Sequence, residues 1–438
     1  MNPLAVLRSR GYVAMLVLAA LIAIPVSSAS YWFLQLVNDL QRWVFTNLPH
    51  GLGFSSQPSW WPLPVLTVMG AVVGMTIRFL PGPAGHIPAE GLKVGKVFTF
   101  LDLPGIAVAA IAGLGLGVVL GPEAPLIALG GGLAALVARG PRAKPEAVAI
   151  MAAAGSFAAI SALMGSPILG AFLLMEVIGL GGAMLDLVLV PGLLASGIGA
   201  LVFVGFGNWT GRGTASLTAP HLPPVGTPTA AQFGWALGIG AAAAVLGSVI
   251  HRLAMRLAAI VQPRIVLIGP VAGLVVGGLA AWYAVASGHG NGDVLFSGQD
   301  QLPTLLSQSS TYSAWALIGL IAAKSLGYLI CLGSFRGGPV FPSMYIGAAL
   351  GIAVSHLPGL PMEAGAGIGI GAMAASMLRL PLTSVLLASV LIGGNSLKLM
   401  PLIVVGVVVS HVLTAWLNPK PNGDKTAATP ARDVAPGT

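Results

Sequence analysis

Apolar runs follow one another from Gly11 to Leu417, and charged residues rarely interrupt them. Only 7% of the 438 residues are charged, whereas a soluble domain carries roughly 25%. Because a helix crosses a bilayer with roughly 20 residues, the chain has room for about ten crossings or more. The sequence therefore predicts an all-α integral membrane protein, with one polytopic domain over 1–417 and a disordered polar tail over 418–438.

Glycine and proline interrupt short apolar runs at Gly82–Pro88, Gly121–Pro125 and Gly337–Pro342. Helices that begin or end there are too short to span, so we expect many broken and tilted helices. The basic residues gather at the ends of the runs. They are Arg8, Arg10, Arg78, Arg139, Arg142, Lys144, Arg252, Arg256, Arg264 and Lys420. By the positive-inside rule, they place the N-terminus in the cytoplasm of a multi-pass protein of the cell membrane.

The sequence lacks the residues that several other functions would need. The net charge of +8 does not indicate nucleic-acid binding, because the basic residues form no patch with stacking groups. The single Cys331 lies in an apolar run and supports no thiol chemistry. His86 and Glu90 are spaced to share a helix face, but a metal needs three or four ligands. We interpret them as a polar pair and expect no metal and no cofactor.

Two motifs occur twice in the same order. GPEAPLIALG (121–130) and GPVFPSMYIG (338–347) share the pattern G-P-x-x-P-x-x-x-x-G. At nearly equal distances downstream, PILGAFLLMEVIG (167–179) and PLTSVLLASVLIG (381–393) both begin with proline and end with glycine. This repetition predicts two homologous halves, roughly 60–210 and 230–417. In membrane transporters such halves often have opposite orientations and hold the solute midway, where broken helices meet.

The G-P-x-x-P motifs predict helix starts inside the membrane. Glycine permits close approach of the backbone, and proline fits a first turn whose N–H groups have no partner. A buried helix start offers free N–H groups and partial positive charge, which suits an anion. AGHIP (84–88) is a third candidate start. The expected pore-helix starts comprise Gly121, Pro122, Pro125, Gly338, Pro339 and Pro342.

Two acids break the repeat, since Glu123 corresponds to Val340 and Glu176 to Val390. An ionisable group in a bilayer is costly and is by default a functional candidate, which favours a functional role for Glu123. For Glu176, a structural acid and a proton or water path are equally consistent with the sequence.

Three further basic residues and one polar segment are interpreted as structural rather than functional features. Lys324, Arg379 and Lys398 are interpreted as snorkelling or loop charges, although one of them could add positive potential to the path. The polar stretch 287–301 is interpreted as an exposed, turn-rich connection.

These motifs resemble those of the chloride channel and chloride/proton antiporter (ClC) family, whose pore motifs are G-S-G-I-P, G-R-E-G-P and G-x-F-x-P. AGHIP, GPEAP and GPVFP occur in the same order, within a resemblance that extends from about Gly82 to Trp416 and is stronger in the second half. The resemblance implies a ClC-like two-fold inverted repeat, a homodimer with one pore per subunit, and contact with membrane lipid. We expect no regulation by the tandem nucleotide-binding modules that some relatives carry.

The resemblance also implies roles for individual residues. Glu123 becomes the gating glutamate, and Glu176 matches the acid on a later helix. The implied anion-binding positions are Gly85, His86, Ile87, Val340 and Phe341. Gly85 replaces the family's coordinating serine and Pro122 the usual arginine. Val177 falls where proton-coupled members have a second, proton-transferring glutamate, and the family's pore tyrosine has no match near the C-terminus.

We therefore expect transmembrane transport of chloride or another monovalent anion, channel-like or uncoupled and gated by Glu123. Acid or a high anion concentration should favour opening, because Glu123 is an anion that competes for the same place. A proton-coupled chloride antiporter and a fluoride exporter of the same fold are alternatives, although Val177 disfavours coupling. An intramembrane hydrolase using Ser410 and His411 belongs to a different class, and adjacent residues on a helix point in different directions.

Overall fold

The computed structural model describes residues 8–92, 98–139, 144–179, 183–213 and 222–418. Every regular element within these ranges is helical, as predicted. The predicted disordered tail falls almost entirely outside them. Seven described helical segments are long and apolar enough to cross a membrane. They are Arg10–Gly51, Pro62–Phe79, Pro145–Met164, Leu187–Thr210, Ala230–Ser287, Ala314–Ser334 and Pro381–Leu417.

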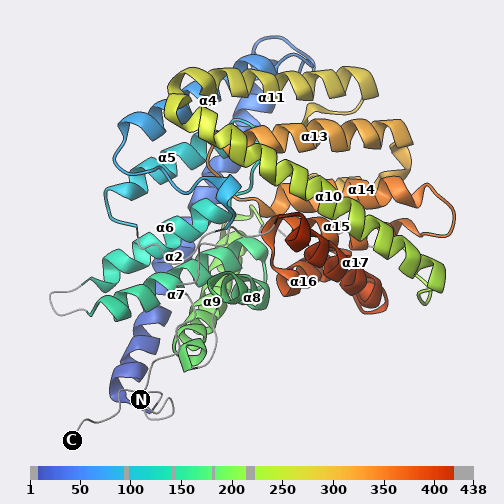
Figure 1. The fold of residues 1–438 in the computed structure, drawn as a ribbon. Helices are drawn as coiled ribbons and strands as arrows, with labels where there is room; N and C mark the ends of the chain where they lie inside the picture. Colours follow the sequence, from blue (N-terminus) through green and yellow to red (C-terminus); the bar gives the residue numbers. More distant parts are fainter. Residues whose placement is uncertain (1–7, 93–97, 140–143, 180–182, 214–221, 419–438) are drawn as a thin grey trace, which may run out of the picture.

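Long and short helices are interspersed along the chain (Figure 1). The longer helices are α2 (Arg10–Arg42), α4 (Pro62–Phe79), α7 (Pro145–Met164), α9 (Ala183–Thr210), α10 (Ala230–Val261), α11 (Ile265–Ser287), α13 (Ala314–Ser334) and α17 (Ser396–Leu417). The shorter helices are α3 (Leu48–Gly51), α5 (Asp102–Gly115), α6 (Glu123–Ala138), α8 (Pro167–Ile178), α12 (Leu302–Ser307), α14 (Val340–Ser355), α15 (Met362–Leu378) and α16 (Pro381–Ile392). The expectation of many helices too short to span is confirmed.

Helix α2 runs through the first half of the molecule and packs against α7 and α9 (Figure 1). The Ser9 hydroxyl accepts the Tyr12 N–H at 3.1 Å and so caps its start. At 33 residues the helix is about 50 Å long, and it continues as a π-helical turn over Trp43–Asn47. Its far end carries Gln35, Asn38 and Gln41 at three-residue spacing, which places neighbouring polar side chains along one side.

The sequence repeat appears as two sets of three helices, α6–α7–α8 and α14–α15–α16. In each set the first two helices pack together, and Figure 1 shows the two sets on opposite sides of the molecule, with α8 packed on α16 between them. Helices α14 and α15 approach backbone to backbone, because a Cβ added to Gly347 or Gly369 would overlap the carbonyl of the other glycine. Such contacts between small residues replace the hydrophobic effect as the packing force inside a membrane.

The segment 287–301 is rich in turns, as predicted, and its ends include exposed residues, but its central part is buried. Val294 and Leu295 are fully buried, and Phe296 donates its backbone N–H to the Gly117 carbonyl at 3.3 Å. The reason lies in Lys324 of α13, which is fully buried, so the prediction that it snorkels is wrong. Its Nζ donates to the carbonyls of Asp293, Val294 and Leu295 at 2.8, 3.2 and 3.1 Å.

The buried lysine also lies 4.3 Å from the centre of the Tyr345 ring, a cation–π contact with α14. Beside it, the Tyr312 hydroxyl donates to Asp293 Oδ2 at 3.0 Å, and the His289 ring stacks on the Tyr312 ring. Burial raises the pKa of Asp293 above its usual value, and the hydrogen bond from Tyr312 opposes that shift. Lys324 thus fixes the 291–296 backbone against the helix that begins at Val340.

Candidate functional site

The starts of α6 and α14 meet and are bonded to each other. Gly121 N donates to Gly338 O at 2.8 Å, and Gly338 N donates to Gly121 O at 2.6 Å. Pro122 and Pro339 are the N-caps of the two helices and have no N–H to offer. The N–H of each motif glycine is therefore already bonded to the carbonyl of the other glycine. Backbone donors for a solute must come from residues further along the first turns of the two helices.

Glu123 is the first residue of α6, and its side chain crosses to the start of α14. It is fully buried, and its Oε1 accepts the backbone N–H of Phe341 at 2.9 Å. Its Oε2 has no partner among the described residues. Both helix N-termini direct partial positive charge at this carboxylate. The carboxylate therefore occupies a place built for a negative charge.

The geometry explains why both motifs contain glycine. A Cβ added to Gly121 or to Gly338 would overlap the carboxylate of Glu123. Because neither glycine has a positive φ, the requirement is for space rather than for backbone freedom. The two glycines and Glu123 thus form one unit, in which the missing side chains leave room for the carboxylate.

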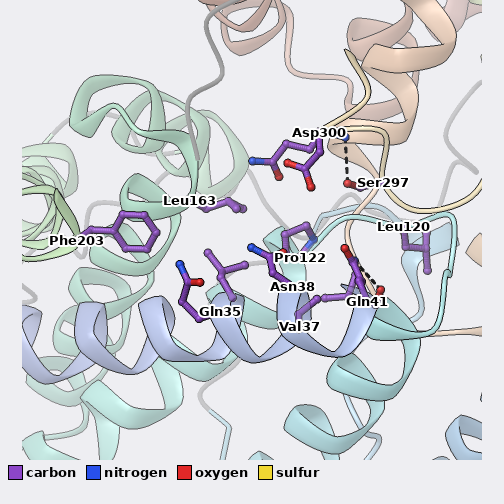
Figure 2. Close-up of a pocket in the computed structure, with 13 residues that line it drawn as sticks. Gln35, Val37, Asn38, Gln41, Leu120, Pro122, Leu163, Phe203, Ser297 and Asp300 are labelled. Atoms are coloured by element: carbon purple, nitrogen blue, oxygen red, sulfur yellow. Dashed lines mark hydrogen bonds between the residues drawn. The ribbon is translucent and has the colours of Figure 1, made fainter. Parts of the chain in front are cut away.

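A pocket of about 60 Å³ lies beside Pro122, the residue before Glu123, and we call it the Gln41 pocket. Figure 2 shows Gln35, Asn38 and Gln41 of α2 facing Ser297 and Asp300 of the 287–301 segment, with Pro122 near the centre. Gln41 Nε2 donates to the Leu114 carbonyl at 2.9 Å, which fixes its side chain. The remaining lining residues are Leu34, Val37, Leu114, Leu120, Leu163, Phe203 and Gln299.

A second and smaller pocket of about 10 Å³, room for about one water-sized group, lies beside Ala124 and Pro125, the residues after Glu123, and we call it the Arg336 pocket. It is lined by Ala84, Gly85, His86, Ile106, Ala124, Pro125, Ala128, Arg336 and Gly337. Pro122 lines the Gln41 pocket and Ala124 lines the Arg336 pocket, so Glu123 lies between the two cavities in the chain.

The predicted third helix start, at 84–88, is wrong in its extent. Only a 3₁₀ turn forms there, Pro88–Glu90, because Gly91 then turns the chain with φ +86°. Gly85 and His86 line the Arg336 pocket, whereas Ile87 packs against the hydrophobic core. Gly85 has φ +106°, a backbone conformation that glycine adopts without strain.

The other predicted site residues have separate places. Val340 and Phe341 are buried at the start of α14, and Pro125 and Pro342 lie in the first turns of α6 and α14. The Ser410 hydroxyl donates to the Ala372 carbonyl at 2.7 Å, a structural bond rather than a pairing with His411. Within the described ranges, no group of three potential ligands is placed to hold a metal ion.

Glu176 lies away from Glu123 and caps a helix of the other half. Its Oε1 accepts Leu382 N at 3.0 Å, and its Oε2 accepts Thr383 N at 2.8 Å and the Thr383 hydroxyl at 2.6 Å. Helix α16 begins at Pro381, so these N–H groups belong to its first turn and have no partner within the helix. The contacts favour the structural role that the sequence left open.

Sequence reasoning missed Tyr328 and Arg336. The Tyr328 hydroxyl donates to the Pro339 carbonyl at 2.7 Å and so holds the N-cap of α14, a contact without any signal in the sequence. Arg336 lines the second pocket, and a feature of the sequence could have pointed to it. It is a lone arginine in a long apolar region and directly precedes the two glycines of the second motif.

Broken membrane helices whose starts meet between two repeated halves are typical of membrane transport proteins. The sequence matches the family described as Voltage gated chloride channel over residues 79–415. The chain therefore belongs to this family of anion transport proteins.

Two curated relatives are similar over nearly the whole chain. "Putative ion-transport protein YfeO" of Salmonella schwarzengrund (strain CVM19633) is 29% identical, over 94% of this chain and 95% of its own length. The protein of the same name from Escherichia coli O1:K1 / APEC is 28% identical, over 94% of both chains.

Solved structures confirm the predicted ClC-like fold. A slow cyanobacterial Cl⁻/H⁺ antiporter superposes with a TM-score of 0.77 at 21% identity, over 93% of this chain and 95% of that chain. A CLC-type fluoride/proton antiporter gives a TM-score of 0.70 at 19% identity, over 92% of this chain and 95% of that chain.

Proposed function

We propose that this chain conducts chloride, or another monovalent anion, without obligatory proton exchange, and that Glu123 is its gate. The observation that carries the proposal is the 2.9 Å hydrogen bond from Phe341 N to Glu123 Oε1. A backbone amide that holds a carboxylate oxygen also suits a halide, since each is an anion that accepts an N–H. The tethered carboxylate and the transported anion then compete for one place, and removal of Glu123 opens it.

The two pockets supply the path on either side of this gate. With the N-terminus in the cytoplasm of the cell membrane, the Gln41 pocket at the far end of α2 faces outward and the Arg336 pocket faces inward. Pro122 and Pro339 withhold two N–H groups near the centre, which weakens the hold on a bound ion. Conduction requires binding weak enough for the ion to leave, so these prolines suit rapid passage.

Two observations support conduction without proton coupling. Val177 lies where proton-coupled relatives are expected to have a second glutamate, and its side chain has no titratable group. Glu176 is next to it, but both of its oxygens accept hydrogen bonds from the first turn of α16. A carboxylate engaged in this way serves as a helix cap rather than as a proton carrier.

We also propose that the protein is a homodimer with one pore in each subunit. Family membership supports the assignment, and apolar side chains on α8 and α16 leave a surface for lipid or a second copy. Ile168 is 61% exposed and Leu382 is 46% exposed. Crosslinking in native membranes tests the dimer, since a crosslinked mass of one chain only would contradict it.

Purified protein in chloride-loaded liposomes tests the transport mechanism. Chloride efflux and external pH are recorded together, for the wild type, for Glu123→Ala and for protein-free liposomes. We expect chloride efflux without uphill proton movement. Proton movement in a fixed ratio to chloride would contradict the uncoupled mechanism. Efflux of fluoride but not chloride from matched liposomes would show that the protein is a fluoride exporter.

A further inference from the structure

Arg336 is a buried arginine in the wall of the second pocket, and only 5% of it is exposed. Helix α13 ends at Ser334, and an extended Phe335 carries the chain inward to Arg336 and the glycines that precede α14. Burial of a charged group costs several kcal/mol unless other groups compensate for it. The burial of this charged side chain therefore needs an explanation.

The hydrogen bonds of Arg336 go to uncharged groups of the described residues, so none of these bonds pairs its positive charge with a carboxylate. Nε donates to the Pro83 carbonyl at 3.2 Å, Nη1 to the Phe335 carbonyl at 3.1 Å, and Nη2 to Gln262 Oε1 at 3.0 Å. All three acceptors are uncharged, and Glu90 is the acid that acts on the guanidinium electrostatically. A guanidinium has five N–H groups, so two remain for a ligand.

The pocket around Arg336 reaches the first turn of α6, the helix that Glu123 begins. Ala124 and Pro125 of α6 line it together with Gly337, so it ends beside the two helix starts. Gly85 lies across from the arginine, and a Cβ there would come within 3.7 Å of Arg336 Cδ. The arginine stem thus lies beside the position where the family pattern has a serine.

We propose that Arg336 is the cationic ligand of an anion-binding site in this pocket, which receives a monovalent anion before the anion reaches the place of Glu123. The inference rests on the proposed function, which it deepens by assigning the second binding position. A full positive charge there replaces the hydroxyl that Gly85 lacks. Because Arg336 also ties Pro83 to the chain before α14, binding must be separated experimentally from structural support.

Bromide binding to the purified protein in detergent tests the proposal without any transport step. Titration calorimetry and the bromide-dependent rise in the apparent Tm are measured for wild type, Arg336→Gln, Arg336→Lys and Arg264→Gln. Arg264 is an exposed arginine two residues from Gln262, so its variant removes the same charge outside the pocket. The bromide-free Tm reports structural support separately.

We expect Arg336→Gln to weaken bromide binding by about tenfold or more, the effect of losing a hydrogen bond to a charged group. Arg336→Lys should recover part of the affinity, and Arg264→Gln should match the wild type. Equal bromide affinity in Arg336→Gln and Arg264→Gln would overturn the proposal. If Arg336→Gln does not fold, equal bromide affinity in Arg336→Lys and wild type overturns it instead, because an ammonium does not reproduce the guanidinium contacts.

The binding result is distinguishable from the outcome for the proposed function. Normal chloride flux with bromide affinity independent of Arg336 rejects the binding site alone. Arg336-dependent bromide affinity together with fixed proton coupling rejects the uncoupled mechanism alone.

Discussion

Glu123 and Phe341 begin two different helices from two halves of the chain, and the carboxylate of the first accepts the backbone N–H of the second at 2.9 Å. One side chain of the first half thereby binds the helix start of the second half. The second half has Val340 at the matching position, so the scaffold occurs twice and the proposed gate once.

Replacement of Glu123 by alanine should give anion flux that no longer depends on pH. In the wild type, acid protonates the carboxylate and removes the charge that holds it at the helix starts, so flux should rise as pH falls. Without the carboxylate, flux at neutral pH should increase by roughly tenfold, the factor for losing one charge-assisted hydrogen bond. Liposome flux across a pH series measures this.

The control for this variant is Glu363→Ala, which removes another buried acid from the first turn of a helix, α15. It should keep the pH dependence of the wild type. A pH dependence that persists in Glu123→Ala would place the gate at another group.

Gly338→Ala should displace the gate without removing it. The added methyl group would occupy the space of the Glu123 carboxylate, so the carboxylate must leave its bond with Phe341. We expect higher flux at neutral pH and a flatter pH profile, in the direction of Glu123→Ala. Gly394→Ala is the matched control, because a Cβ there meets nothing within 4 Å. A normal pH profile in correctly folded Gly338→Ala protein would show that the glycine does not confine the gate.

Glu176→Ala should lower stability but leave the ratio of protons to anions unchanged. It removes three accepted hydrogen bonds from the start of α16, and loss of a helix cap costs about 0.5–2 kcal/mol. Glu146→Ala, which alters an exposed acid in the first turn of α7, is the control. Melting in detergent and paired flux measurements test the two parts. A changed proton ratio would assign Glu176 to a proton path.

Lys324→Met should destabilise the protein more than any of these changes. Four carbonyls of the 291–296 segment would lose their donor, and each buried group left unsatisfied costs about 1–3 kcal/mol. Lys398→Met is the matched control, because its Nζ donates to the single carbonyl of Val225 at 3.0 Å. Equal apparent Tm values for the two variants would contradict the assigned role of Lys324.

The sequence predicts the membrane class, the short helices and the repeat because these depend on patterns along the chain. The G-P-x-x-P spacing also locates the two helix starts and the single acid between them. The mutual bonding of Gly121 and Gly338 is different, because it depends on contacts between residues far apart in the sequence. No local pattern shows that each motif glycine uses its N–H on the other.

Lys324 and the 287–301 segment illustrate the same limit. Composition describes that segment as polar and rich in turns, which is true of its residues but not of its environment. The burial of its central residues follows from one lysine on α13 that donates to four of its carbonyls, a tertiary contact that overrides local preference. Arg336 differs in that its isolation in an apolar region was visible, although the pocket beside it was not.

The central claim is that Glu123 occupies the place of the transported anion, and bromide-soaked crystals test it most directly. Anomalous scattering is measured for wild type and Glu123→Ala at neutral pH. We predict a bromide peak within hydrogen-bond distance of Phe341 N in Glu123→Ala and none there in the wild type. A bromide bound at Phe341 N while the wild-type carboxylate keeps its position, or no bromide there in either protein, would contradict the account.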